Sequence, residues 1–147
     1  MTYTTSKLIQ PTLPTAGEVT AMLLVADQNH ERLQSEWFAA WERSEATSLN
    51  AEVTETVATS AAWGEIDGKN KEQRDAQLAL ALLNNKHLQQ MQDRQREAQR
   101  GLKLVEIALE SARVHRGALH DIARLVMAER LAEANQGLGA LFGWNQS

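Results

Sequence analysis

The chain of 147 residues has no cysteine, only two prolines and few aromatic residues. The absence of cysteine excludes disulfide bonds, thiolate metal ligands and a cysteine nucleophile. Both prolines, Pro11 and Pro14, lie near the N-terminus, and proline is the residue that interrupts helices most strongly. From Thr15 onward, therefore, helices can run for long distances without a proline break.

Patterns typical of membrane insertion, export and catalysis are also missing. No run approaches the roughly 18 apolar residues that span a bilayer, and the first residues lack the basic and apolar parts of a signal peptide. Walker loops, dinucleotide-binding glycines and a G-x-S-x-G motif are absent, and the four histidines do not have metal-binding spacing. We therefore expect a cytoplasmic, non-enzymatic protein that uses no cofactor or metal and does not contact membranes.

The N-terminal part reads as an arm followed by a long helix. Residues 1–14 are polar and contain both prolines, which favours an extended arm. The sequence Thr15-Ala-Gly-Glu18 matches a capping box, in which the first and last side chains cap each other's backbone. The helix that starts here can continue to about Trp63, although a Ser/Thr-rich stretch at 44–60 favours a break or a flexible segment. Its apolar positions recur every three or four residues: Val19, Met22 or Leu23, Ala26, Leu33, Trp37, Ala40 or Trp41, and later Val53, Val57 and Ala61.

Residues 64–70 predict a reversal of the chain. This stretch contains two glycines and an Asp-Gly step, which permit the backbone conformations of tight turns. Asn70 then has the position of a second helix cap, with Gln73 reaching back toward it. Asn84-Asn85 predicts a kink or short break rather than a domain boundary. Residues 15–135 are thus expected to form one long antiparallel helical hairpin, an all-α fold.

The strongest helical pattern runs from Lys86 to Asn135. Apolar residues occupy most of a heptad series that starts at Leu88, with Gln95 and Arg116 as polar exceptions. The series comprises Leu88, Met91, Gln95, Ala98, Leu102, Val105, Leu109, Ala112, Arg116, Leu119, Ala123 and Val126. A second row beside it contains Leu104, Ala108, Ala118, Ile122 and Leu125. Such regularity is typical of a coiled-coil seam, and a helix of about 75 Å must bury its seam against partners to be stable.

An apolar tail at residues 136–147 ends the chain. Gly137 is expected to end the preceding helix. The cluster of Leu138, Leu141, Phe142 and Trp144 either folds back onto the hairpin or docks on another chain.

The apolar seam and two tryptophans together predict an interface with a second copy or with another protein. Trp37 and Trp41 share one helical face. They are expected to fill the core between the two helices. If the facing helix offers only alanines there, the tryptophans would instead form a dimer interface. The expected interface residues are Leu102, Val105, Leu109, Ala112, Leu119, Ile122, Val126, Trp37 and Trp41. We therefore expect a homo-oligomer that recognises proteins by helix packing.

Charge is divided unevenly along the chain. Residues 1–65 have three basic and nine acidic side chains, whereas residues 66–147 have twelve basic and ten acidic ones. Arg96, Arg100 and Lys103 share a face that suits phosphates, but acids lie between them and no aromatic residue is near enough to stack on bases. Intramolecular charge pairing is the favoured interpretation, and nucleic-acid binding is the alternative.

The stretch Gly68-Lys-Asn-Lys-Glu-Gln-Arg-Asp-Ala-Gln77, before a long Arg/Glu/Leu/Ala helix, resembles small all-helical coiled-coil proteins of bacteriophages and prophages. The similarity covers residues 65–126 and implies a phage origin, with no catalytic residues to carry over. A phage setting suits an accessory or assembly factor, or an inhibitor that binds a host protein in the host cytoplasm. The alternatives are a DNA-binding accessory of phage recombination or replication, and a structural component of the virion.

Overall fold

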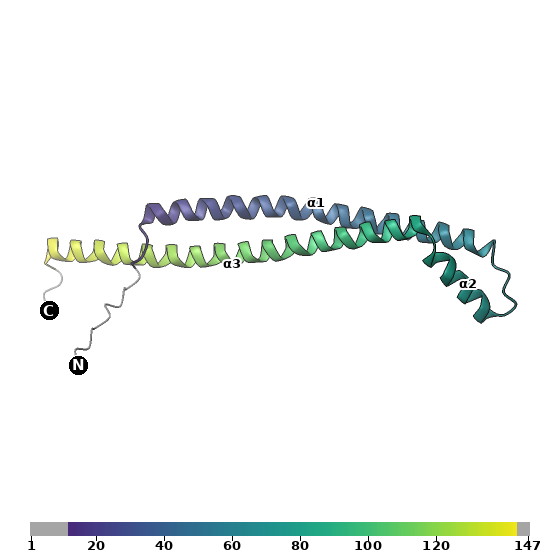
Figure 1. Cartoon of the computed structure of the whole chain (residues 1–147). Helices are drawn as coiled ribbons and strands as arrows, with labels where there is room; N and C mark the ends of the chain where they lie inside the picture. Colours follow the sequence, from purple (N-terminus) through teal and green to yellow (C-terminus); the bar gives the residue numbers. More distant parts are fainter. Residues whose placement is uncertain (1–11, 144–147) are drawn as a thin grey trace, which may run out of the picture. The chain divides into compact units, whose positions relative to one another are not determined.

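The computed structural model describes residues 12–143, which contain three α-helices and no strand (Figure 1). These are α1 (Ala16–Trp63), α2 (Lys71–Leu83) and α3 (Lys86–Phe142). The expected all-α class is therefore confirmed. The chain divides into two compact units: the first comprises Met1–His30 and Ala112–Ser147, and the second comprises Glu31–Ser111.

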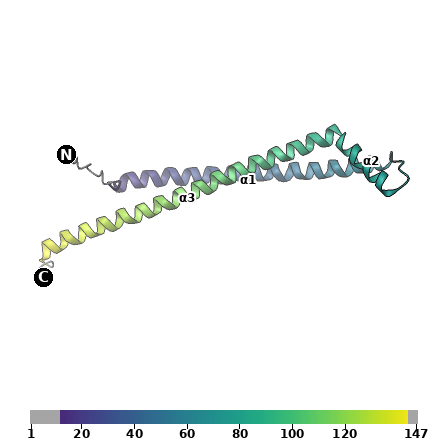
Figure 2. The same cartoon turned by 60° about the horizontal axis from the view of Figure 1, so that its bottom comes forward.

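Within each unit, α1 and α3 contact each other and run antiparallel. In the first unit Asp27 of α1 meets Arg116 of α3, while the start of α1 lines a common groove with residues 123–131 of α3. In the second unit the Gln95 amide donates to the Ser48 hydroxyl over 3.2 Å. The second unit also contains α2, which connects the end of α1 to the beginning of α3 (Figure 2).

The first helix begins with the predicted capping box. The Glu18 backbone N–H donates to Thr15 Oγ1 over 3.2 Å, and the Thr15 backbone N–H donates to Glu18 Oε2 over 3.3 Å. Two backbone donors that the helix itself cannot satisfy are thus paired.

The Ser/Thr-rich stretch of α1 is continuous helix, so the break or flexible segment expected at 44–60 is not present. The hydroxyls of Thr47, Thr54 and Thr56 donate to the backbone carbonyls of Arg43, Asn50 and Glu52, one turn earlier, over 2.7–2.9 Å. Each hydroxyl is therefore satisfied inside the helix instead of competing with its backbone hydrogen bonds.

The reversal between α1 and α2 is held by side-chain amides. The Gln77 amide accepts from the Gly68 backbone N–H over 3.0 Å and donates to Asp67 Oδ1 over 2.8 Å. Asn70 caps α2 by accepting from the Gln73 backbone N–H. Gln73 reaches back as predicted, but its oxygen accepts from the backbone N–H of Lys69 rather than that of Asn70.

Asn84 and Asn85, which separate α2 from α3, form different hydrogen bonds. The Asn84 backbone N–H donates to the Leu80 carbonyl and ends α2. The Asn85 side chain accepts from the Leu88 backbone N–H over 3.0 Å and caps α3. The chain therefore changes helix at residues 84–85, where the sequence predicts a kink or short break.

The predicted heptad seam of α3 is the covered face of that helix. Every one of its twelve positions is buried or half-buried. The most deeply buried are Leu88 and Ala98 in the second unit and Ala112, Leu119 and Val126 in the first. Gln95 and Arg116 reach polar partners on α1, so the two polar positions are tolerated.

The covered face of α1 differs from the prediction after residue 44. Val53 and Val57 are more than half exposed, and Ala61 is also exposed. The buried residues there are all small: Ser44, Ala51, Ala58 and Ala62. The prediction chose the more hydrophobic face, whereas helices that approach closely select small side chains.

The C-terminal part of α3 also differs from the prediction. Gly137 does not end the helix, which continues to Phe142. The left-handed residue that follows is Gly143, with φ of +67°, as expected for a glycine just after a helix. Leu138, Leu141 and Phe142 are thus helical and largely exposed, whereas Trp144 lies outside the described residues.

Candidate protein-binding surfaces

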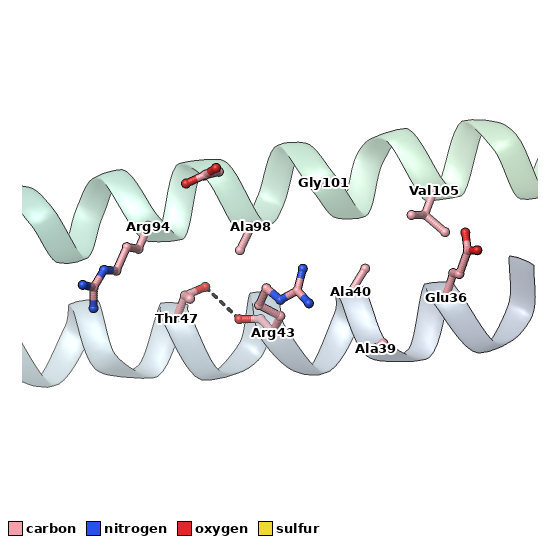
Figure 3. A pocket seen from close by; sticks show the side chains of 10 residues that line it. Glu36, Ala39, Ala40, Arg43, Thr47, Arg94, Ala98, Gly101 and Val105 are labelled. Atoms are coloured by element: carbon pink, nitrogen blue, oxygen red, sulfur yellow. Dashed lines mark hydrogen bonds between the residues drawn. The ribbon is translucent and has the colours of Figure 1, made fainter.

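The second unit has an open groove of about 540 Å³ between α1 and α3. Its floor is made of small residues, namely Ala39 and Ala40 from α1 and Ala98 and Gly101 from α3 (Figure 3). A Cβ atom added at Gly101 would meet no atom within 4 Å. The groove therefore exists because small side chains leave the space between the helices unfilled.

Charged side chains of both signs line this groove. Glu36 and Arg43 belong to α1, and Arg94 and Glu97 belong to α3. Figure 3 shows Arg43 between the two alanines Ala40 and Ala98, with its guanidinium group in the groove. This lining suits a partner segment that presents an apolar side chain with polar groups beside it. The residues that line the groove do not include a Ser, Cys or His nucleophile.

Three aromatic residues form a cluster on α1 in the same unit. The rings of Trp37 and Trp41 stack with centroids 6.4 Å apart, and Phe38 meets Trp37 edge-on at 5.2 Å. Trp37 is half-buried at a seam position, whereas Trp41 and Phe38 are 43% and 60% exposed. Trp37 therefore belongs to the core, and the other two rings are accessible to a partner.

The seam residues expected to form an interface are already covered within the chain. Ala112, Leu119 and Val126 are less than 8% exposed, and Leu102, Val105, Leu109 and Ile122 are half-buried. A second copy could reach these residues only if α1 moved away from α3. Association through the seam stays a prediction, and it would require exchange of α1 between chains.

Large apolar residues lie on the outer faces instead. On α3, Leu104 and Ile107 of the second unit and Val114 and Leu125 of the first are each about 60% exposed. The expected second row is thus open where it contains Leu104, Ala118 and Leu125 and only half-covered at Ala108 and Ile122. Monomeric proteins seldom expose such regularly spaced large apolar side chains without a binding role.

The outer face of α1 carries a further apolar row, in which Val53 and Val57 belong to the apolar spacing expected from the sequence and Leu49 does not. Leu49, Val53 and Val57 are 60%, 53% and 63% exposed. They are spaced by four residues and therefore follow one ridge of the helix. The buried face can be told from this one by its seven-residue spacing, which continues from Val19 through Ala26, Leu33, Ala40 and Thr47 to Thr54 and contains only small residues after Leu33.

The basic residues of the nucleic-acid alternative are exposed but partly paired. Arg96 forms an ion pair with Asp93, and Lys103 lies 3.5 Å from Glu106, in both cases one turn away. Arg100 lies on the same face of α3 between them. Surface pairs of this kind are weak, so phosphates could compete for the two cations.

One polar contact lies inside the seam of the first unit. Arg116 Nε and Asp27 Oδ1 are 2.6 Å apart, and both atoms are shielded from water. The remainder of each side chain is about two-fifths exposed. The pair thus sits at the edge of the seam, where it joins one position of α1 to one position of α3.

Residues 12–143 contain neither a membrane-spanning helix nor a cluster of metal-binding side chains. None of their helices has a stretch long and apolar enough to cross a membrane. Within the same residues, His, Asp and Glu do not gather in groups of three that could hold a metal ion. Comparisons of the chain with family models, with curated proteins and with solved structures found no match.

Proposed function

We propose that the chain is a non-enzymatic, helical-hairpin protein that acts by binding other proteins and by associating with itself. The resemblance of residues 65–126 to phage helical proteins supports a phage origin. In that setting the chain would serve as an accessory or assembly factor, or as an inhibitor that occupies a host protein.

The exposed apolar residues of α3 carry this proposal. Leu104 and Ile107 of the second unit are three residues apart, and Val114 and Leu125 of the first unit are eleven residues apart, so the two members of each pair lie on one side of the helix. Burying a large aliphatic side chain stabilises a complex by about 1.5–3 kcal/mol. A partner helix that covered either pair would therefore gain more energy than an exposed ion pair contributes.

The test is affinity capture from bacterial lysate with the tagged full chain and a matched variant. The variant L104Q/I107Q/V114Q/L125Q keeps good helix formers at exposed positions, and circular dichroism verifies its helix content. We expect specific bound proteins, identified by mass spectrometry, to be lost with the variant. An identical set of proteins bound to both chains would contradict the proposal.

DNA binding is the alternative with the least support, because Arg96 and Lys103 already have acidic partners on α3. It requires retention on DNA that weakens steeply as salt increases. A virion component would instead form large symmetric assemblies.

A further inference from the structure

The apolar row Leu49, Val53 and Val57 on α1 lies in the most acidic part of the chain. Between Arg43 and Lys69 the sequence contains no lysine, arginine or histidine, but it contains the five acids Glu45, Glu52, Glu55, Glu65 and Asp67. The local net charge is therefore strongly negative over the last five turns of α1 and the loop that follows it.

Carboxylates border this row on one side. Glu45 is four residues before Leu49, and Glu52 is three residues after it, so both are its neighbours on the helix surface. Among residues 12–143, the ion pairs do not include Glu45, Glu52 or Glu55. These carboxylates are thus available for charges supplied from outside the chain.

A shallow pocket continues the acidic border toward the end of α1. Glu52, Glu55 and Trp63 line it together with Thr56, Thr59 and Ser60. Trp63 is 47% exposed, and an indole face beside carboxylates attracts lysine and arginine side chains. The pocket therefore offers a cationic side chain two kinds of partner.

We propose that this face of α1, defined by Leu49, Val53 and Val57 with the border Glu45, Glu52 and Glu55, binds a basic amphipathic helix of a partner protein. Apolar residues of that helix, spaced by three or four, cover the row. Lysines or arginines along its edge meet the carboxylates and Trp63. Apolar burial gives affinity, and the one-sided charge selects basic helices over acidic ones. This inference rests on the proposed function and specifies one partner class.

The test measures binding of two synthetic peptides to the full chain by fluorescence anisotropy. Both peptides are 18-residue amphipathic helices with leucines at positions i, i+3, i+4 and i+7, flanked by lysines in one and by glutamates in the other. We expect the lysine peptide to bind at least roughly tenfold more tightly. Equal binding of the two peptides would overturn the inference.

Paired variants locate the binding face. V53Q/V57Q changes only exposed side chains, and we expect it to weaken binding of the lysine peptide roughly tenfold. L80Q/L83Q makes the same kind of change at exposed residues of α2 in the same unit and should leave binding unchanged. If V53Q/V57Q binds like the unchanged chain, or if it alters the sedimentation of the chain by itself, a basic partner helix does not occupy this face.

A charge-matched pair separates specific recognition from general attraction to an acidic protein. E45Q/E52Q should weaken binding and lower its salt dependence, whereas E129Q/E133Q removes the same charge from α3 of the first unit and should do neither. Equal effects of the two would overturn the inference. Lysate partners that bind through α3 and ignore V53Q/V57Q would leave the proposed function intact while excluding this face.

Discussion

At the scale of single residues, the reversal between α1 and α2 accounts for several residues of the motif at residues 68–77. Gly68, Asn70, Gln73 and Gln77 each take part in closing the loop. The motif is therefore a structural device for starting α2, and its residues need no catalytic or ligand-binding explanation.

Gly68 offers a direct test of that interpretation. A Cβ added there would lie 2.9 Å from the Arg74 backbone nitrogen, closer than atoms can approach, so Gly68→Ala should lower the stability of this region by about 1–2 kcal/mol. The control is Gly64→Ala, whose Cβ would make an ordinary 3.4 Å contact. Hydrogen exchange of residues 64–77 measures the effect, and equal protection in both variants would contradict the account.

Arg116 supports a second prediction at this scale. Arg116→Ala leaves Asp27 without its partner, and because both side chains are partly exposed the cost should be small, about 1 kcal/mol or less. Arg116→Met also removes the partner of Asp27, but its long apolar side chain keeps more of the packing at this seam position, so it should cost less than Arg116→Ala. Urea unfolding of the three proteins gives the order of stability. A methionine variant less stable than the alanine variant would refute this explanation.

At the scale of helices, the sequence predicts the seam of α3 correctly and the face of α1 incorrectly after residue 44. Along α3 large apolar residues such as Leu88, Leu119 and Val126 occupy most positions of the heptad repeat, so hydrophobicity and heptad spacing point to the same face. Along α1 they conflict, because Val53 and Val57 are large while the buried positions are Ala51 and Ala58. Hydrophobicity alone could not reveal that small side chains let the helices approach closely.

Val57 and Ala58 are adjacent in α1 and allow a direct test of which face of the helix is buried. Ala58 is 8% exposed and Val57 is 63% exposed. Ala58→Gln forces a long polar side chain into the covered face and should cost about 1–3 kcal/mol, whereas Val57→Gln should change the free energy of unfolding by less than about 0.5 kcal/mol. Thermal unfolding of the two variants, monitored by circular dichroism, compares their free energies of unfolding. Equal losses, or a larger loss for Val57→Gln, would mean that the predicted face is the buried one.

The helix ends show a similar division between what could and could not be predicted. Thr15, Asn70 and Asn85 have side chains that start helices by specific hydrogen bonds, and each lies at an observed boundary. Gly137 lacks any such bond, and glycine only lowers helix stability by about 1 kcal/mol. The helix therefore continues past it, and Gly143 takes the left-handed position instead.

At the scale of the whole molecule, the feature to be explained is the large number of exposed apolar side chains. Small residues fill much of the contact between α1 and α3, so many large apolar side chains remain outside. Exposed apolar side chains that gather on one face of a helix often mark protein-binding sites. Our account is that these outer faces bind helices of other chains, including further copies of this one.

Sedimentation equilibrium of the full chain at micromolar concentration tests that account most directly. We predict a molar mass of at least twice the 16.3 kDa of one chain, with L104Q/I107Q/V114Q/L125Q shifting the mass toward that of a single chain while its helix content stays the same. A compact species of 16.3 kDa for the unchanged protein at every concentration would contradict self-association. A multimer unaffected by the variant would show that the exposed residues of α3 do not cause it.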